Sequence, residues 1–512
     1  MRTPLTIGGH LDRAALVYGD RTGIIDEPDP PGGGLGQLTY TRMRDLARAQ
    51  AAGLDARGIG RGERVAVLSQ NSGRLLTSFF GVSGFGRVLV PINFRLSPAE
   101  IEYILGHSGS SMLLVDEELA DAVAHLDVEH RIVMGTATDA EVFPEGAEPQ
   151  PWEDQDEDAT ATINYTSGTT ARPKGVELTH RNLWTNSSIF GWHTGVNDRD
   201  VFLHTLPMFH CNGWGMPYAL TAMGVPQVVL RKVDGTDILR RIDEHGVTLL
   251  CGAPAVVAMV LDAAATWDGP IPGAGRTRVV VAGAPPPTRT IERIETELGW
   301  EMIQIYGLTE TAPLLTINRR RQEWDDLTPT DRASLLSRAG VPAVGIDVRI
   351  SDQGEVLARG NHILKSYWEQ PDATADALED GWFHTGDGGT IDEGGYLRIS
   401  DRKKDIIISG GENVSSIEVE DALFSHPGVA EVAVIGVPHE KWGETVKALV
   451  VLTEGQTATE DELRAWCKER LAGYKCPTSI DFVDELARTA TGKLQKFKLR
   501  APYWEGRDRQ VN

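Results

Sequence analysis

Hydrophobic residues recur with two different spacings along the first two thirds of the chain. Residues 65–68 and 112–115 form short continuous apolar runs, which are typical of buried strands, whereas residues 74–82 repeat apolar positions at helical intervals. Residues 97–105 are also predicted to be helical, and their first residues, SPAE, form a capping box with proline in the first turn. Helices that alternate with buried strands predict layers of parallel α/β structure.

The alternation continues beyond residue 160. Two segments before that point interrupt it: residues 26–36, DEPDPPGGGLG, predict a hairpin loop, and the acidic residues 116–158 predict a solvent-exposed excursion without a site. After it, strands are predicted at residues 161–165, 176–178, 201–206, 227–230, 249–251 and 279–281, and helices at 180–190 and 238–245.

The pattern changes to short strands and close Gly/Asp turns near residue 339. Residues 339–400 predict a small β-barrel-like subdomain, and the charged run DRKK at 401–404 predicts a boundary. The remaining residues, 405–512, predict a small α+β domain with helices at 417–424, capped by Ser415 with Glu418, and at 460–471, capped by Thr459 with Glu462. The chain is therefore predicted to hold an α/β domain over 1–400, a hinge at 401–404 and a small C-terminal domain.

Composition narrows the function classes. The 512 residues carry a formal charge of −23, which argues against binding polyanions such as nucleic acids. The four cysteines show neither CxxC spacing nor a neighbouring His at ligand intervals, so a zinc site and a disulfide framework are not predicted. No apolar window reaches the length of a membrane span or a signal peptide. We expect a soluble cytoplasmic protein without an integral membrane segment. A homodimer is left open as its oligomeric state.

The loop at residues 165–175, YTSGTTARPKG, carries the strongest chemical signal. Its small and hydroxylated residues expose hydroxyls and backbone N–H groups, and Lys174 adds a positive charge, so the loop can wrap a phosphate chain. It is not a Walker A motif, because Lys174 is followed by Gly175 and the loop is predicted to join two strands. A flexible surface linker is the alternative for TSGTT alone.

This loop resembles the phosphate-binding signature of the adenylate-forming superfamily, which includes acyl-CoA synthetases, aryl-CoA ligases and firefly luciferase. Among these the chain is most similar in its motifs to fatty- or medium-chain acyl-CoA ligases. Ala171 departs from the pattern, which usually has Gly or Ser there, and its methyl group is expected to restrict the loop tip.

Two further motifs follow in the order that the superfamily has. QIYGLTE at 304–310 provides Tyr306 as a flat face for a purine and Glu310 as a hard ligand for Mg²⁺. GWFHTGD at 381–387 ends in Asp387, a carboxylate that can accept ribose hydroxyls, and Arg402 follows fifteen residues later. Taken alone, QIYGLTE is also typical of the end of an ordinary strand, and the Asp of GWFHTGD is typical of a β-turn. Together they resemble the superfamily's adenine, metal and ribose motifs.

The C-terminal part resembles the family's mobile domain. Lys404 falls where the family has its hinge, and charged, solvated residues suit a hinge. Ser409 and the glycines after it match the loop that lines the pantetheine tunnel. ARTATGKLQK places Lys493 after a glycine, where the family has its adenylation lysine; Ala487 replaces the usual Pro, and a solvated terminal lysine is the alternative.

The segment PMFHCNGWG at 207–215 is the candidate acyl site. It places His210 and Trp214 on a loop after a strand, beside small and apolar residues. The neighbouring His210 and Cys211 suggest a nucleophile and its base, but adjacent residues of a strand point to opposite faces, so we set this interpretation aside. The stretch resembles the one that flanks the carboxylate in acyl- and aryl-CoA ligases, where the His closes the site.

The resemblance implies an ATP-dependent acyl-CoA ligase that uses Mg²⁺ and CoA and activates a fatty or aromatic acid as acyl-AMP. An adenylating enzyme that loads a separate carrier protein or partner enzyme is the alternative. A luciferase-type oxygenase shares the first half-reaction, and a non-enzymatic nucleotide-binding protein is disfavoured by Glu310 and Lys493. The implied site residues are, for catalysis, Lys493, Glu310, Lys174 and His210; for nucleotide and coenzyme binding, Thr166, Ser167, Gly168, Thr169, Thr170, Lys174, Gly283, Ala284, Pro285, Gln304, Tyr306, Gly307, Thr309, Asp387, Arg402, Lys404, Ser409, Gly410, Gly411 and Lys493; and for the metal, Thr166 and Glu310.

Overall fold

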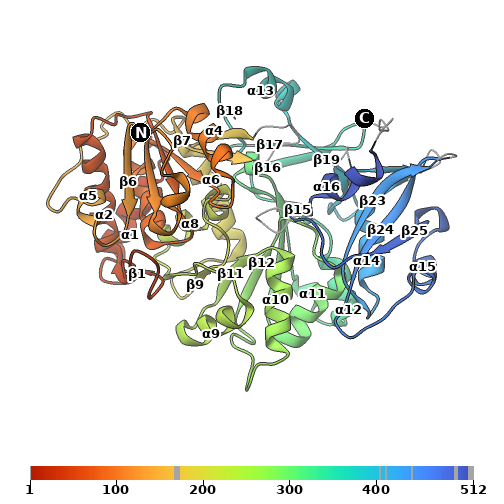
Figure 1. Cartoon of the computed structure of the whole chain (residues 1–512). Coiled ribbons are helices and arrows are strands. Elements are labelled where there is room, and N and C mark those ends of the chain that lie inside the picture. Colours follow the sequence, from red (N-terminus) through yellow and green to blue (C-terminus); the bar gives the residue numbers. More distant parts are fainter. Residues whose placement is uncertain are drawn as a thin grey trace.

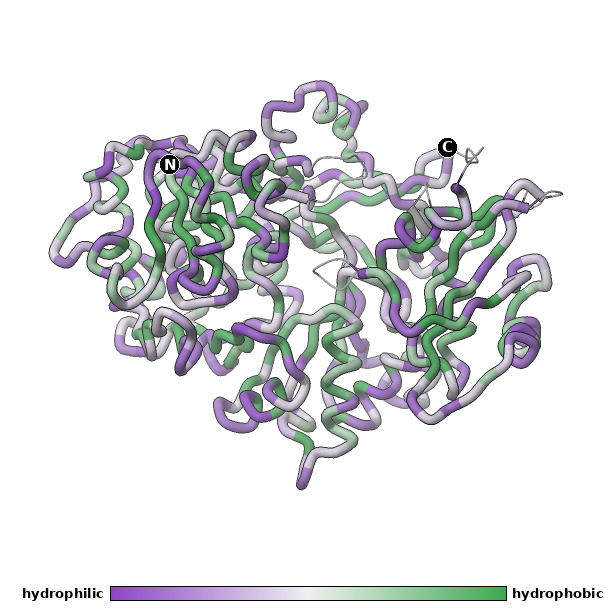
Figure 2. Tube along the Cα trace, viewed as in Figure 1, coloured by the Kyte–Doolittle hydropathy of each residue, from purple (hydrophilic) through white to green (hydrophobic). Residues whose placement is uncertain are grey.

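Two large sheets, a smaller antiparallel sheet and a separate C-terminal domain make up the molecule (Figure 1). The computed structural model describes residues 2–166, 173–402, 405–409, 412–439, 442–488 and 494–505. The tube coloured by hydropathy shows the most hydrophobic segments inside, along the strands (Figure 2). The N-terminus lies with the first α/β layers, and the last helices belong to the C-terminal domain (Figure 1).

The larger of the two main sheets has the strand order β15-β14-β13-β12-β11-β9-β10-β1-β2 within the described residues. Its inner strands run parallel to one another: β13, β12, β11, β9, β10 and β1. Antiparallel strands lie at both edges. The bounds are β1 Thr22–Ile25, β2 Gln37–Thr39, β9 Phe202–His204, β10 Gln227–Val229, β11 Leu249–Gly252, β12 Arg278–Val281, β13 Glu301–Gly307, β14 Leu314–Arg319 and β15 Val341–Pro342.

The second sheet has the order β18-β8-β7-β4-β3-β5-β6, again parallel in the middle and antiparallel at β7, β8 and β18. The prediction that the loop at residues 165–175 joins two strands is confirmed, since β7 and β8 flank it. The bounds are β3 Arg64–Leu68, β4 Val88–Ile92, β5 Ser110–Asp116, β6 His130–Met134, β7 Thr160–Thr166, β8 Lys174–Thr179 and β18 Ser366–Tyr367.

Alternate residues of β3 enter different cores, one on each face of the second sheet. Val65 and Val67 of β3 pack with the helices between the two sheets, whereas Ala66 and Leu68 face the outer helix α4. Helices α9 to α12 cover the outer face of the larger sheet. The bounds are α1 Gly8–Val17, α2 Tyr40–Ala56, α3 Gly73–Gly81, α4 Pro98–Ser108, α5 Asp139–Val142, α6 His180–Thr194, α7 Cys211–Trp214, α8 Met216–Ala222, α9 Gly235–His245, α10 Pro254–Ala264, α11 Thr288–Arg293 and α12 Pro329–Leu336.

The antiparallel subdomain and the C-terminal domain follow. The first is a curled sheet of order β16-β17-β19-β20, and the second has the order β22-β21-β24-β23 with β25 beside β24. The C-terminal domain contacts the large domain through Asp421, which accepts from the backbone N–H and hydroxyl of Thr288. The bounds are β16 Ile346–Ile350, β17 Glu355–Gly360, β19 Phe383–Ile391, β20 Leu397–Arg402, β21 Ile407–Ser409, β22 Glu412–Val414, β23 Val429–His439, β24 Gly443–Leu452, β25 Ser479–Phe482, α13 Pro371–Ala377, α14 Ser416–Phe424, α15 Glu460–Lys468 and α16 Lys496–Arg500.

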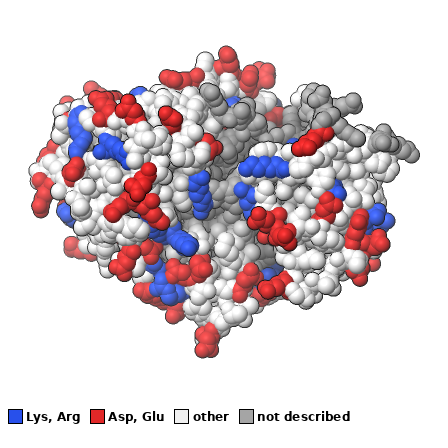
Figure 3. Space-filling view, viewed as in Figure 1, with Lys and Arg blue, Asp and Glu red and all other residues white. Residues whose placement is uncertain are grey.

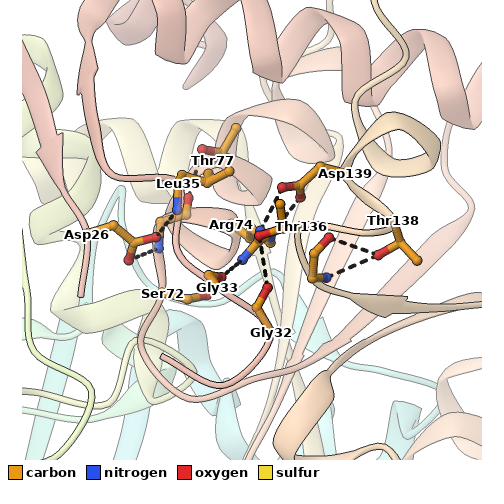
Figure 4. A network of polar contacts seen from close by, with 12 residues as sticks. Asp26, Gly32, Gly33, Leu35, Ser72, Arg74, Thr77, Thr136, Thr138 and Asp139 are labelled. Atoms are coloured by element: carbon orange, nitrogen blue, oxygen red, sulfur yellow. Dashed lines mark hydrogen bonds and ion pairs between the residues drawn. The ribbon is translucent and has the colours of Figure 1, made fainter. Parts of the chain in front are cut away.

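The hairpin loop after β1 is held by a buried polar network (Figure 4). Asp26 accepts from the backbone N–H groups of Gly73, at the start of α3, and Leu35. Arg74 donates to both carboxylate oxygens of Asp139, at 2.6 and 2.7 Å, and to the carbonyl oxygen of Gly33. Burial raises the pKa of Asp26, and these donors oppose that shift. The hairpin predicted from residues 26–36 is confirmed, and its loop is anchored to α3 and, through Arg74, to α5.

Two sequence predictions outside the candidate site are wrong. The acidic segment 116–158 is not simply a solvated excursion, because it contains β6 and α5, and Asp116 is buried against Arg231 with contacts of 2.7 and 2.8 Å. The hydroxyl of Ser415 does not cap α14, since it donates to the carbonyl of Ser400. The capping boxes at Ser97 and Thr459 are confirmed.

Buried histidines make the fold acid-sensitive. Burial is the largest cause that lowers the pKa of His10, His180, His204 and His362 to about 4, from 6.5. Below pH 6.5 the unfolded chain binds protons that the folded chain does not. The histidine contribution to the free energy of unfolding is therefore intact above pH 6.5 and falls as the pH drops towards 4. Each histidine lowers that free energy by about 1.4 kcal/mol per pH unit. We expect urea midpoints to fall steadily over this range.

A single substitution checks the histidine contribution. His362 lies 2.7 Å from the carbonyl oxygen of Leu314 through Nε2. His362→Gln keeps a donor there and should reduce the acid slope by about one proton. His125→Gln, at an exposed position, is the matched control and should leave the slope unchanged. Equal slopes for all three proteins would contradict this account.

Candidate active site

The site residues gather where parallel strands of the larger sheet end, facing β7, β8 and the curled sheet. Ligands of open α/β sheets bind at such carboxyl ends. Strand β13 ends at Gly307, where an added Cβ would lie 1.6 Å from the carbonyl oxygen of Pro313, so only glycine fits. The close approach at Gly307 is made by the chain itself.

Tyr306 and Asp387 are joined although they lie far apart in the sequence. The hydroxyl of Tyr306 donates to Oδ2 of Asp387 at 2.7 Å. Asp387 is buried, and its backbone N–H donates to the hydroxyl of Thr385 at 3.1 Å. In the antiparallel pair of β19 and β20, Asp387 lies opposite Arg402. Two predicted motifs, for the base and for the ribose, therefore meet at one place.

Glu310 belongs to a second cluster, which includes a residue that sequence reasoning missed. The hydroxyl of Tyr367 donates to Oε1 of Glu310 at 2.9 Å, and Nζ of Lys174 lies 4.7 Å from the centre of the Tyr367 ring. Burial, followed by the Glu310 carboxylate, raises the pKa of Tyr367, so its hydroxyl keeps its proton. Thr166 and Lys174 lie opposite each other at the ends of β7 and β8, where the predicted phosphate loop begins and ends.

The loop on the other side of the expected base follows β12. Gly283 has a positive φ of 92°, and Gly283, Ala284 and Pro285 are exposed. Gln304 lies on β13 with a buried amide, whose Oε1 has no hydrogen-bond partner among the described residues. Thr309 is buried beside Cys211. An unsatisfied buried acceptor of this kind is costly.

A small cavity of about 30 Å³ lies next to this cluster. His210 reaches it from the loop after β9, and the end of β13 forms another part of its wall. The two predicted acyl-site residues, His210 and Trp214, therefore line one space. The full lining is His210, Cys211, Trp214, Ala282, Gly283, Ile305, Gly307, Leu308, Thr309 and Pro313.

The segment after His210 is not an extended strand. The rule that neighbouring strand residues point to opposite faces therefore does not apply to His210 and Cys211. Helix α7 is one turn with left-handed backbone: φ is 46° at Cys211, 52° at Asn212, 59° at Gly213 and 61° at Trp214. Each non-glycine residue in this region costs about 1–2 kcal/mol. Such strain persists only where surrounding contacts impose it, and it is characteristic of functional sites.

Several predicted residues lie outside the described part of the chain: Ser167, Gly168, Thr169, Thr170, Lys404, Gly410, Gly411 and Lys493. Ser409 is described and ends β21 in the C-terminal domain, where it is half-buried. In the described ranges, no helix is both long and apolar enough to cross a membrane. Acidic side chains are spread over the face drawn in Figure 3, in agreement with the net charge.

Comparison with known proteins decides the family. The profile described as AMP-binding enzyme matches residues 11–368, and the AMP-binding enzyme C-terminal domain matches residues 418–493. The chain belongs to the AMP-binding enzyme family. Its resemblance to the adenylate-forming superfamily is confirmed, and so is the predicted class, an AMP-forming acid–thiol ligase.

Relatives of this AMP-binding enzyme match it almost end to end. The 4-hydroxybutyrate–CoA ligase 2 of Metallosphaera sedula is 37% identical over 97% of this chain and 94% of its own. The 2-methylpropanoate–CoA ligase of Humulus lupulus is 37% identical over 97% and 95%. The O-succinylbenzoate coenzyme A synthetase of Bacillus subtilis, solved with ATP and magnesium ion, has a TM-score of 0.82 at 29% identity, covering 96% of this chain and 98% of that one.

The donor groups of the AMP-binding enzyme fit a magnesium ion that arrives with a nucleotide. Among the described residues, no three His, Cys, Asp or Glu side chains form a metal cluster. Mg²⁺ is commonly held by one or two carboxylates together with substrate phosphates, without a cage made by the protein alone. Glu310, a single carboxylate near Lys174, agrees with that arrangement.

Proposed function

We propose that the chain is an ATP-dependent acyl-CoA ligase that activates a fatty or aromatic carboxylic acid as acyl-AMP and transfers the acyl group to CoA. The observation that carries this proposal is the meeting of separate motifs at one end of the larger sheet. Tyr306 contacts Asp387, and Glu310 contacts Tyr367, which lies beside Lys174. The full-length matches to acid–CoA ligases support it.

In the first half-reaction, a carboxylate oxygen of the acid attacks the α-phosphorus of ATP in line, the bond to pyrophosphate breaks, and acyl-AMP forms. Tyr306 flanks the base, and Asp387 with Arg402 holds the ribose. Thr166 to Thr170 and Lys174 hold the β- and γ-phosphates. Positioning and charge stabilisation supply most of the catalysis in such phosphate chemistry.

Glu310 would hold magnesium, with Thr166 as the second proposed ligand. When bound, Mg²⁺ neutralises charge on the phosphates. His210 closes the acid's end of the site, and Lys493 enters to stabilise charge between the carboxylate and the α-phosphate. These residue roles rest on the motif positions and on the contacts of Tyr306, Glu310 and Lys174.

In the second half-reaction, the sulfur of the CoA thiolate attacks the acyl carbonyl, the bond to AMP breaks, and a thioester forms. The C-terminal domain is proposed to turn at Lys404, so that Lys493 leaves and Ser409, Gly410 and Gly411 line the path of the pantetheine arm. The naming of relatives as CoA ligases favours CoA over a carrier protein as acceptor. A carrier protein remains the alternative acceptor.

A product assay tests the proposed function. We expect Mg·ATP and a carboxylate panel to give AMP and pyrophosphate, and addition of CoA to give an acyl thioester, because the motifs direct attack to the α-phosphate. Chromatography resolves AMP from ADP, and chelation of magnesium should abolish both products. ADP as the main product would remove the adenylate-forming mechanism. Acyl-AMP without thioester formation would favour a carrier protein.

A further inference from the structure

Helix α4 contacts the two strand ends between which the predicted phosphate loop runs. We call these ends the stems: Tyr165 and Thr166 are the last residues of β7, and residues 173–175 lead into β8. Tyr103 and His107 are four residues apart on α4, so they share one face of the helix. Their rings are stacked, with centres 5.3 Å apart. This face of α4 holds both stems.

The first stem is held by a hydrogen bond between His107 and Tyr165. Nδ1 of His107 lies 2.8 Å from the hydroxyl oxygen of Tyr165, and the two rings meet edge to face with centres 5.8 Å apart. Burial raises the pKa of the Tyr165 phenol, so the hydroxyl keeps its proton. The hydroxyl can therefore donate to Nδ1 of a neutral His107.

The second stem is held by Tyr103 and by Trp368, the residue that follows β18. The hydroxyl of Tyr103 donates to the carbonyl oxygen of Pro173 at 3.5 Å. The backbone N–H of Trp368 donates to the carbonyl oxygen of Gly175 at 2.8 Å, and its Nε1 donates to the carbonyl oxygen of His107 at 3.0 Å. The second stem is thus tied to α4 both directly and through Trp368.

The two stems are closely packed against each other. In the ladder of β7 and β8, Tyr165 lies opposite Gly175, and Thr166 lies opposite Lys174. A Cβ added at Gly175 would lie 3.2 Å from Cζ of Tyr165 and 3.2 Å from Cβ of Trp368. Packing this close transmits a shift of one group to its neighbours. The position of the Tyr165 ring therefore affects where Thr166 and Lys174 lie.

Trp368 also connects α4 with the cluster at Glu310. Its neighbour Tyr367 donates to Oε1 of Glu310 at 2.9 Å, and the Tyr367 ring lies 4.7 Å from Nζ of Lys174. One dipeptide, Tyr367 and Trp368, thus contacts both the helix and the residues proposed to hold metal and phosphate. The contacts of α4 are part of the support of the nucleotide site.

From these contacts we infer that His107, with Tyr103 beside it, positions the stems so that Thr166 and Lys174 meet the β- and γ-phosphates of ATP. His107 is a positioning residue, because it acts through Tyr165. This inference rests on the proposed roles of Thr166 and Lys174. It predicts a selective effect, since ATP carries the β- and γ-phosphates, whereas AMP and acyl-AMP do not.

Nucleotide binding without acid, measured by titration calorimetry, tests this selectivity in the absence of turnover. His107→Leu removes Nδ1 and leaves the Tyr165 hydroxyl without that acceptor. We expect the Kd for Mg·ATP to rise about 10-fold, the upper range for one lost hydrogen bond, and the Kd for AMP to stay unchanged. His107→Asn, whose amide oxygen can replace Nδ1 as acceptor, should restore the affinity for Mg·ATP. Glu102→Gln, at an exposed position of α4, is the matched control and should bind both nucleotides as the parent does.

A double-mutant cycle assigns the effect to the contact between the two rings. Tyr165→Phe removes the other partner of the same hydrogen bond, so it should also weaken Mg·ATP selectively, and it replaces His107→Leu if that variant does not fold. The double variant should bind Mg·ATP no more weakly than either single variant, because both remove one contact. Additive losses would overturn the inference, as would equal weakening of ATP and AMP or an unchanged affinity for Mg·ATP in the folded single variants.

The two half-reactions give a second readout that general damage to the fold would not reproduce. His107→Leu should raise the KM for ATP by about 10-fold with little change in kcat, because ground-state and transition-state contacts to these phosphates weaken together. Thioester formation from synthetic acyl-AMP and CoA should stay at the parent rate. Equal losses in both half-reactions would overturn the positioning role. If the parent protein forms AMP from no acid, the proposed function fails, whereas the comparison of ATP with AMP binding still decides the role of His107.

Discussion

Glu310→Gln should lower the rate of acyl-AMP formation by about 10²–10³-fold, since one preorganised charge at a reacting phosphate is commonly worth that much. Glutamine has nearly the same shape and can still accept from the Tyr367 hydroxyl, which lies 2.9 Å from Oε1 of Glu310. The substitution therefore removes the charge and leaves the local contact. Single-turnover formation of acyl-AMP, measured over a range of magnesium concentrations, gives the result.

Tyr367→Phe is the matched control for this prediction. It removes the hydroxyl that orients Glu310 but keeps the carboxylate and the aromatic face beside Lys174. We expect a small rate loss and a higher magnesium requirement, because the ligand stays and only its orientation is released. A rate for Glu310→Gln close to that of the parent protein, at any magnesium concentration, would show that Glu310 is not the metal ligand.

The alternation of apolar runs predicted the layered fold because burial on both faces of a strand leaves a strong local signal. Residues 65–68 show it well: consecutive side chains enter two different cores. Prediction was wrong where a long-range partner changes the meaning of a residue. Asp116 looks solvated in an acidic segment, yet Arg231, 115 residues later, pairs with both of its oxygens.

The site residues likewise fall into those that a local motif predicts and those that only long-range contacts bring into place. The residue types at Tyr306, Glu310 and Asp387 point to nucleotide chemistry, and their motifs are local in sequence. Tyr367 carries no motif, and its position beside Glu310 follows from long-range contacts: the pairing of β18 with β8 and the bond from the backbone N–H of Leu364 to the carbonyl oxygen of Glu310. The left-handed turn at Cys211 to Trp214 had a signal only in its middle, since Asn-Gly at 212–213 favours positive φ, whereas Cys and Trp rarely adopt it and tertiary contacts impose it there.

A substitution at Lys493 should separate the two half-reactions. Lys493 is proposed to act only while pyrophosphate leaves, so Lys493→Ala should slow formation of acyl-AMP from acid and ATP by about 10²–10³-fold. Once the small domain has turned, Lys493 has left the site and the loop at Ser409, Gly410 and Gly411 has replaced it. The same variant, given synthetic acyl-AMP and CoA, should form thioester at close to the parent rate.

The comparison between half-reactions guards against a misfolded variant, because a protein that has lost its fold loses both. Lys498→Ala is a useful control: Lys498 lies five residues beyond Lys493, on α16, with its Nζ 6.0 Å from the ring centre of Phe497. It should leave both rates unchanged. If Lys493→Ala slows the two half-reactions equally while remaining folded, Lys493 stays in the site throughout, and the proposed rotation at Lys404 does not operate in this chain.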